Sequence, residues 1–355
     1  MRIAIDIREA CKERRTGKGQ WTHGFTKELL LRGFHVIAYT DRPVPPSLHA
    51  DVGGVQVRTP RWRGWLWHWA VARHVRRFSG ADLYVSPTSY IVPALLGGRF
   101  PVLPVIHDLI AFRNEPHEAR ARRIERFTLG RAVRSARHIL TVSGATKQDL
   151  LKRFPSQSPQ GVTPVFAGPM QDAVPANVPD GRTILCAGTL SPRKNQLRLI
   201  RAYARLDPGL RKRFSLVLTG ARGWQDNEII ASARDTPGVV WKDFVDEAEY
   251  GRLLSTCVVF ALPSLYEGFG LQILDALQRG IPILTSRRGS LPEVCGNAAH
   301  YVDPEDIGSI AAGLDLLLRE ERVRADLRDR ALSQAASFNW KRTVDLFLGA
   351  VGGVC

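Results

Sequence analysis

The sequence has no long hydrophobic run and few cysteines. None of its apolar stretches approaches the roughly 20 residues that a bilayer-spanning helix needs. The five cysteines are odd in number, scattered and without paired spacing, which argues against a disulfide framework and a zinc site and favours a reducing compartment. The first residues, Met1–Asp6, read as a strand and not as a signal peptide. We therefore expect a cytoplasmic protein.

Acidic residues are scarce relative to basic ones: 34 Asp and Glu face 50 Lys and Arg, a net charge of +16. Residues 1–172 hold 27 basic and 13 acidic side chains, whereas residues 173–355 hold 23 and 21. Nearly all the excess therefore lies in the N-terminal half. A half this basic suggests an anionic partner, either a phosphorylated lipid, a membrane surface or a nucleic acid. No nucleic-acid-binding motif accompanies the charge, so we expect no nucleic acid.

At 355 residues the chain exceeds what one core usually supports, so two domains are expected. Short buried strands alternate with helical patterns, which predicts α/β domains with doubly wound parallel sheets and ligands at the carboxyl ends of the strands. In the N-terminal half the expected strands are 3–7, 35–39, 82–85, 102–106 and 138–142, and the expected helices are 21–31, 65–78 and 120–137.

A proline-rich span, 155–180, separates the two halves. We place the domain boundary near residue 170, giving domains of 1–170 and 171–339. Further strands are expected at 183–187, 214–218, 239–241, 257–262 and 282–284.

The most informative stretch runs from Pro263 to Gly280 and follows an apolar run that predicts a buried parallel strand. Gly268 and Gly270 predict a turn, and residues 271–279 are good helix formers that stop at Gly280. This order points the free N–H groups of the helix at the space above the sheet. We expect a phosphate there; the alternative is a surface glycine turn without a ligand.

Two carboxylates flank this turn. Glu267 lies in it, and Asp275 lies in the helix, eight residues later. At about 1.5 Å of rise per helical residue they can sit roughly 10 Å apart. Carboxylates only accept hydrogen bonds and suit pairs of hydroxyl groups, so this pair could bind a sugar on one side of a diphosphate and a ribose on the other.

The second half opens with a similar junction. The strand Thr183–Ala187 ends at Gly188, and Arg193 and Lys194 follow. An arginine can bind a phosphate through two parallel N–H bonds, and a lysine adds a compact charge. The alternative for an isolated Arg-Lys pair is a solvated surface. Since parallel strands end at the same edge of a sheet, we expect these cations to face the turn of Glu267.

These segments resemble the retaining nucleotide-sugar glycosyltransferases of family 4, which have the GT-B fold. The stretch from Glu267 to Asp275 is similar to the family's glutamate-x7-glutamate signature, with aspartate as the second carboxylate. The stretch from Gly188 to Lys194 matches its G-x-x-x-x-R-K segment. The resemblance is specific over residues 183–304 and looser before them. It implies two Rossmann-like domains facing across a cleft, with a terminal helix, 340–355, packed on the first.

The resemblance also implies roles for these residues. Glu267 would hold the donor sugar, and Asp275, one methylene shorter than glutamate, would hold the ribose. Arg193 and Lys194 would neutralise the donor diphosphate. The other donor-binding candidates of this half are Gly188, Gly220, Gly268, Phe269, Gly270 and Leu271.

The N-terminal half offers weaker candidates. His107 belongs to an H-D-L segment that resembles one near the donor sugar and the reaction centre, although a lone histidine there is usually structural. Gly17 and Gly19 loosely match a glycine-rich loop beside the donor phosphates, with a mobile turn as the alternative. For the acceptor, the candidates are Arg120 and Arg123, in a run whose alternative is a solvated helix face, and Ser143, in a turn that also carries Thr146.

Residues 58–77 interleave six arginines with four tryptophans, half of the eight in the protein. A basic, tryptophan-rich amphipathic helix is typical of a membrane-interface anchor. The alternative is a helix with its tryptophans in the core and its arginines in water.

The resemblance implies a retaining hexosyltransferase that moves a mannose-like sugar from a nucleotide-diphosphate sugar, with GDP-mannose the leading candidate, to a lipid-linked or polysaccharide acceptor. No cofactor and no metal are expected, and no Asp-x-Asp motif is found. We expect peripheral contact with an anionic membrane, at the inner face of the cell membrane. Two alternatives stay open: a catalytically silent relative that binds sugar nucleotides or membranes, and a nucleic-acid binder.

Overall fold

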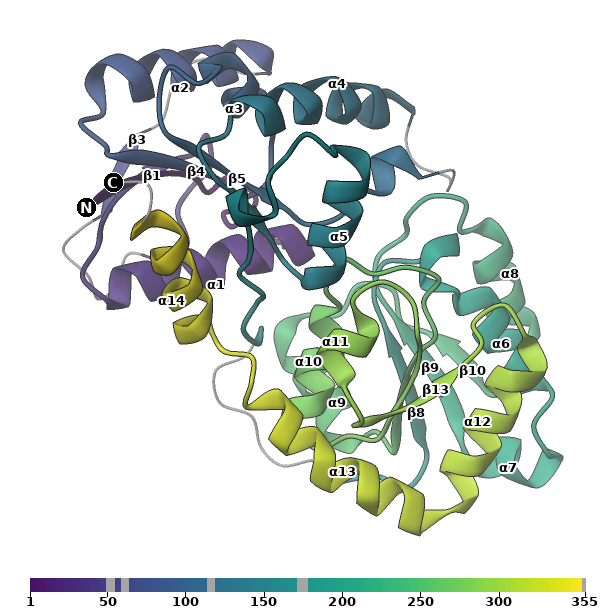
Figure 1. Ribbon diagram of the computed structural model, residues 1–355. Coiled ribbons are helices and arrows are strands. Elements are labelled where there is room, and N and C mark those ends of the chain that lie inside the picture. The colour runs from purple at the N-terminus through teal and green to yellow at the C-terminus, as the bar shows by residue number, and fades with distance from the viewer. Residues whose placement is uncertain (49–54, 59–63, 114–118, 171–177, 353–355) are drawn as a thin grey trace. The chain divides into compact units, whose positions relative to one another are not determined.

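The computed structural model describes residues 1–48, 55–58, 64–113, 119–170 and 178–352, with the side chains of 55–58 and 119–121 left out. The chain divides into two compact units (Figure 1). The N-terminal unit comprises the described residues up to Met170 together with those from Asn339 on. The C-terminal unit comprises the described residues between them, up to Phe338.

The N-terminal unit is built on a seven-stranded parallel sheet of order β3-β2-β1-β4-β5-β6-β7. Apolar runs form the central strands because both faces of the sheet are covered by helices; β4 and β5, for example, are buried throughout. The strands are β1 (Arg2–Asp6), β2 (His35–Tyr39), β3 (Val55–Arg58), β4 (Leu83–Ser86), β5 (Val102–Ile106), β6 (Ile139–Thr141) and β7 (Val162–Pro164).

Helices cover both faces of this sheet. In Figure 1, α2, α3 and α4 lie in a row along one face, and α1 and α14 lie along the other. The helices are α1 (Gly17–Leu31), α2 (Trp65–Phe78), α3 (Ile91–Leu96), α4 (Ala119–Ser135), α5 (Gly144–Arg153) and α14 (Trp340–Gly352).

The last helix, α14, packs on α1 through Trp340 and through Phe347, whose ring stands edge-on to Phe25 at 5.2 Å. Trp340 lies against Gly24 of α1 and against Gly168, where a Cβ would come within 2.1 and 2.6 Å of the indole. A glycine inside a helix lowers the stability of the helix by roughly 1 kcal/mol relative to alanine, but Gly24 makes room for the indole ring. The indole N–H of Trp340 donates to the carbonyl of Pro169 at 2.9 Å. These contacts hold the C-terminal helix in the N-terminal unit.

The C-terminal unit repeats the architecture with six parallel strands of order β10-β9-β8-β11-β12-β13. Its strands are β8 (Thr183–Ala187), β9 (Ser215–Thr219), β10 (Val239–Trp241), β11 (Val259–Leu262), β12 (Ile283–Ser286) and β13 (Ala299–Val302). Its helices are α6 (Gln196–Ala204), α7 (Pro208–Arg213), α8 (Asn227–Asp235), α9 (Glu247–Thr256), α10 (Leu271–Gln278), α11 (Leu291–Cys295), α12 (Ile307–Arg319) and α13 (Glu321–Ala335).

The predicted fold class, two doubly wound parallel α/β sheets, is confirmed. Strands β2, β5, β8 and β10 have the predicted bounds, whereas β3, β7 and β13 were not predicted. Strand β7 lies inside the proline-rich span, and Pro164 fits because it ends an edge strand. Among the described helices, none has the length and apolar character to span a membrane.

The prediction that Gly17 and Gly19 lie in a loop was wrong, whereas their contact with the donor phosphates stays a prediction. Gly17 and Gly19 lie in the first turn of α1, which begins four residues earlier than predicted. Thr16 caps this helix by accepting the N–H of Gly19 at 3.4 Å. A Cβ on Gly19 would come within 2.5 Å of the carbonyl oxygen of Glu9, so glycine is needed for close packing and not for a mobile loop.

Candidate functional site

The segment after β12 contacts the turn between β11 and α10 and fixes its position. Gly270 adopts φ +94, a backbone conformation that favours glycine, and caps α10. The Ser290 hydroxyl donates to the carbonyls of Glu267 and Phe269, at 3.1 and 2.9 Å. Gly289 allows this approach because a Cβ there would come within 2.4 Å of the Glu267 carbonyl oxygen. The turn is therefore fixed on rigid elements before any ligand binds.

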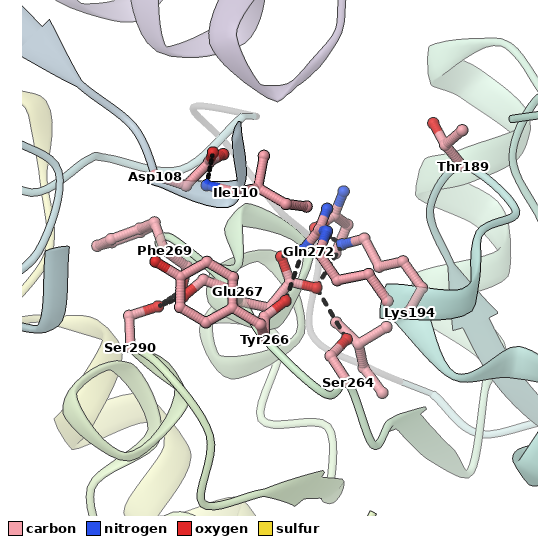
Figure 2. A network of polar contacts seen from close by, with 12 residues as sticks. Asp108, Ile110, Thr189, Lys194, Ser264, Tyr266, Glu267, Phe269, Gln272 and Ser290 are labelled. Atoms are coloured by element: carbon pink, nitrogen blue, oxygen red, sulfur yellow. Dashed lines mark hydrogen bonds and ion pairs between the residues drawn. The ribbon is translucent and has the colours of Figure 1, made fainter. Parts of the chain in front are cut away.

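The carboxylate of Glu267 is the centre of a polar network (Figure 2). One oxygen, Oε2, accepts from Arg193 Nη1 at 2.7 Å. The other, Oε1, lies 2.8 Å from Lys194 Nζ and accepts from the Ser264 hydroxyl at 2.8 Å. Arg193 also donates to the carbonyl of Tyr266 at 2.6 Å. Two cations thus share one carboxylate, and the three charged groups leave a net charge of +1.

The Arg-Lys segment is fixed to the same edge of the sheet. It forms a short 3-10 turn, Pro192–Lys194, that ends at Asn195 with φ +64. The amide of Asn195 donates to the carbonyls of Pro263 and Pro304, at 2.9 and 2.6 Å. In addition, the N–H of Leu265 donates to the carbonyl of Arg193 at 2.8 Å. Hydrogen bonds from the Asn195 side chain and from the Leu265 backbone therefore place the two cations.

Burial decides the electrostatics of this cluster. Burial alone would raise the pKa of Glu267, but Arg193 and Lys194 outweigh it and lower the pKa to about 2. Burial lowers the pKa of Lys194, Glu267 opposes that shift, and Arg193 adds to it. The Lys194 and Glu267 side chains are 7% and 6% exposed, whereas Arg193 is 19% exposed. Arg193 is therefore the charge most open to a ligand.

Two glycines bring neighbouring strand ends close to this cluster. Gly188 follows β8 with φ +137, and a Cβ there would lie 3.2 Å from Lys194 Cε. Gly220 follows β9 with φ +141, and a Cβ there would lie 2.2 Å from the Gly188 carbonyl oxygen. Strands β8 and β11 are the central pair at which the strand order of the sheet reverses. The carboxyl ends of strands at such a reversal are where open α/β sheets bind ligands.

Asp275 lies in α10 and is completely buried. Its carboxylate accepts a hydrogen bond from the Tyr250 hydroxyl at 3.2 Å. Arg279, one turn later, donates to the Asp275 carbonyl at 3.1 Å. The carboxylate therefore has an internal partner, and its contact with a ribose stays a prediction.

His107 follows β5 in the N-terminal unit and is 8% exposed. Its Nε2 lies 2.7 Å from the Pro87 carbonyl oxygen, so it carries the hydrogen. Its ring stands edge-on to Trp21 at 5.7 Å. Burial, together with the charge of Lys18, lowers the pKa of His107 to about 3. The imidazole is neutral at neutral pH, and its Nδ1 is the acceptor atom.

The acceptor candidates have different surroundings. Ser143 is fully buried and caps α5, where its hydroxyl accepts the N–H of Thr146 at 3.0 Å. Arg123 is exposed on α4. Arg120 belongs to α4, but its side chain lies outside the described residues. Arg122 is half-buried and Arg126 is exposed. Both guanidinium groups also donate to the Ala111 carbonyl, at 3.1 and 2.5 Å, and support the turn after β5.

Sequence reasoning missed several residues that position the site. Ser264 and Asn195 are adjacent to the motifs and could have been found from their donor groups. Ser290 and Gly289 lie more than twenty residues from Glu267 in sequence, and no local pattern marks them. Gln272, whose Oε1 lies 3.5 Å from Lys194 Nζ, faces the cluster from the first turn of α10 (Figure 2).

Comparisons with known proteins show the family to which the chain is related. The family model "Glycosyl transferases group 1" matches residues 171–334, and the model "Glycosyltransferase Family 4" matches residues 16–165. O-antigen chain mannosyltransferase B of Escherichia coli is 30% identical over 251 residues, covering 66% of each chain. MMP alpha-(1->4)-mannosyltransferase of Mycolicibacterium hassiacum is 30% identical over 279 residues, covering 72% of this chain and 67% of that protein. The chain thus spans about two thirds of the length of these relatives.

A solved structure shares the whole fold. The crystal structure of Anabaena HepE in complex with UDP and glucose superposes with a TM-score of 0.77, covering 99% of this chain and 100% of that one. The two sequences are 17% identical, so this likeness concerns the fold.

Proposed function

Because the chain belongs to the family 4 glycosyltransferases, we propose that it transfers a hexose from a nucleotide-diphosphate sugar to a glycan or lipid-linked acceptor in surface glycan assembly. The observation that carries the proposal is the sharing of Glu267 between Arg193 and Lys194 at the carboxyl ends of β8 and β11. A cluster with net charge +1 beside a glycine turn suits a diphosphate, and its carboxylate suits sugar hydroxyls.

The leading donor is GDP-mannose. Two mannosyltransferases at 30% identity favour mannose as the sugar. The UDP and glucose of HepE keep UDP-sugars among the donors to be tested. Asp275 and the backbone at Gly188 and Gly220 are our candidates for the nucleoside end of the donor.

We propose that catalysis is electrostatic. As the bond from the anomeric carbon to the diphosphate breaks, Arg193, Lys194 and the N–H groups of residues 268–271 would stabilise the charge on the leaving oxygen. The acceptor hydroxyl would attack from the same face and pass its proton to the leaving phosphate, so that configuration is retained. Glu267 would orient the sugar, and neutral His107 would accept a hydrogen bond from a sugar hydroxyl through Nδ1.

This scheme assigns charge neutralisation to side chains and backbone, so we propose that the reaction proceeds without a divalent metal. The test is transfer in the presence of a chelator, in which activity should persist. Activity that disappears with the chelator and returns with magnesium or manganese would contradict this part of the proposal.

The donor is identified by a thermal-shift screen against GDP-, UDP-, ADP- and dTDP-sugars, followed by a transfer assay with the radiolabelled sugar of the stabilising donor. A ligand that binds only the folded protein raises its melting temperature. We expect one nucleotide class to stabilise the protein and its sugar to appear on a glycan or lipid acceptor. Donor binding without transfer to any glycan acceptor would indicate a catalytically silent relative, and no binding at all would contradict the proposed function.

A further inference from the structure

Helix α2 divides its aromatic residues between the core and the surface. Trp67 is fully buried, and it packs with Val71 and Val75 against the sheet. Trp65 and Trp69, on the opposite side of the helix, are 70% and 49% exposed. The tryptophans of this helix are therefore not all core residues.

Basic residues continue the exposed stripe of α2. Arg73 follows Trp69 by one helical turn, and Arg76 and Arg77 follow in the last turn, next to the exposed ring of Phe78. Among the described residues, no carboxylate lies within ion-pair distance of these three arginines. The stripe thus combines two indole rings with three arginines in contact with water.

Helix α4 presents the same combination on the same face of the sheet. Phe127 is 75% exposed and has Arg123 and Arg131 one turn to either side, with exposed Ile124 beside it. Helix α3, which exposes Leu95, packs against both α2 and α4, and Figure 1 shows the three helices in a row. Arg131 Nε donates to the carbonyl of Ala94 in α3 at 2.9 Å and links these two helices.

Acidic side chains are nearly absent from this surface. In α2, α3 and the described part of α4, the single acidic residue is Glu125, and it is not among the exposed ones. A face of this kind repels a second copy of itself, since it would bring cations against cations. A single-stranded nucleic acid could stack on the rings, but it would leave the exposed aliphatic side chains of Leu66, Leu95 and Ile124 without a partner. Exposed indole rings and aliphatic side chains among arginines match an anionic lipid surface, where rings enter the interface and guanidinium groups meet headgroups.

We propose that the exposed face of α2, α3 and α4, the tryptophan–arginine face, docks this protein onto an anionic lipid bilayer. Trp65, Trp69 and Phe127 enter the interface, and Arg73, Arg76, Arg77 and Arg123 bind the headgroups. The face contains no residue of the Arg193–Lys194–Glu267 cluster. It can therefore be tested without any sugar nucleotide.

The test is co-sedimentation of the full chain with vesicles of phosphatidylcholine alone and of phosphatidylcholine mixed with phosphatidylglycerol. The variants are R73Q/R76Q/R77Q and W65S/W69S. The charge control is R201Q/R234Q/R319Q, which removes three exposed arginines from the C-terminal unit. The apolar control is L332S, at a leucine that is 53% exposed in the same unit. Circular dichroism melting checks that each variant is folded. If W65S/W69S does not fold, F127S replaces it as the aromatic variant.

We expect the wild type to bind the anionic vesicles and not the neutral ones. Each arginine near an anionic surface contributes about fivefold to partitioning, so R73Q/R76Q/R77Q should weaken binding about a hundredfold. W65S/W69S should weaken it at least about tenfold, and both controls should bind like the wild type. Equal binding to neutral vesicles, an equal loss in the charge control, or self-association in place of vesicle binding would overturn the proposal. If vesicle binding fails while sugar transfer persists, only this inference is overturned. If the protein binds vesicles but transfers no sugar, only the proposed function is overturned.

Discussion

The two units share the order of six strands, to which the N-terminal sheet adds β7, but they place their charges differently. Each sheet reverses its order at a central pair, β1 with β4 and β8 with β11. After β1, one cation meets one carboxylate: Arg8 donates to buried Asp6 through Nε and Nη2, at 3.1 and 2.9 Å, and stacks on Trp67. After β8, two cations meet one carboxylate, Glu267.

This difference separates two uses of positive charge. In the C-terminal unit, the unbalanced cation lies at the strand ends, where a ligand binds in such sheets. In the N-terminal unit, the arginines of the tryptophan–arginine face lie on the outer side of helices. On our proposals, a similar topology supports a site for a small anion in one unit and a surface for an anionic membrane in the other.

The largest effect is expected from Arg193→Ala. The substitution removes the most exposed cation of the cluster, which we propose stabilises the leaving diphosphate. The loss of one such donor costs roughly a hundredfold to a thousandfold in rate. The measurement is the turnover number for sugar transfer. The matched control is Arg201→Ala in α6, an arginine that pairs with exposed Glu228. A turnover number for Arg193→Ala equal to that of this control would show that the cluster is structural.

Acid should affect the two units in different pH windows. The pKa of Glu267 is lowered to about 2 from 4.5, so the stability it contributes is present above pH 4.5 and lost as the pH falls toward 2. The pKa of His107 is lowered to about 3 from 6.5, so the unfolded chain binds the proton first, and stability falls as the pH drops below 6.5.

The check is the free energy of unfolding by urea as a function of pH. Glu267→Gln should flatten the curve below pH 4.5, and His107→Asn should flatten it between 6.5 and 4.5, each by on the order of 1 kcal/mol per pH unit. If His107→Asn leaves the slope in its window unchanged, the histidine is not held neutral by the fold.

Gly220→Ala tests the close approach of the strand ends. The added Cβ would lie 2.2 Å from the Gly188 carbonyl oxygen, in a backbone with φ +141. We expect a loss of roughly 3 kcal/mol in unfolding free energy, because both the backbone and its neighbour must move. Gly349→Ala, in α14, meets no atom within 4 Å and should stabilise the chain by roughly 0.5–1 kcal/mol. Equal effects of the two substitutions would contradict the packing described at β8 and β9.

The smallest effect on activity is expected from Asp275→Asn. A ribose contact made through the carboxylate would be weakened, and the KM for the donor should rise by about tenfold with little change in turnover number. A purely structural role, as the acceptor for Tyr250, predicts a lower melting temperature with an unchanged KM. The two measurements together decide which role the buried carboxylate has.

The predictable part of the site consisted of residues in the loops that follow apolar strands. Arg193 and Lys194 lie in the loop after β8, and Glu267 lies in the loop after β11; parallel strands bring such loops to one edge of the sheet. Ser290 and Gly289 reach Glu267 only through the folded sheet, and nothing near them in sequence marks that contact. Gly17 and Gly19 suggested a loop because glycine is a poor helix former, but the Thr16 cap and close packing against Glu9 stabilise a helix there. Whether a tryptophan of α2 is buried depends on how the helix is rotated against the sheet, which composition does not reveal.

The most direct test of the Arg193–Lys194–Glu267 cluster is calorimetric titration with the nucleoside diphosphate and monophosphate of the base found in the screen. The wild type should bind the diphosphate at least about tenfold more tightly, since a charge-assisted hydrogen bond contributes roughly 1.5–3 kcal/mol. In Arg193→Ala that preference should largely disappear, whereas Arg201→Ala should keep it. An undiminished preference for the diphosphate in Arg193→Ala would contradict the account.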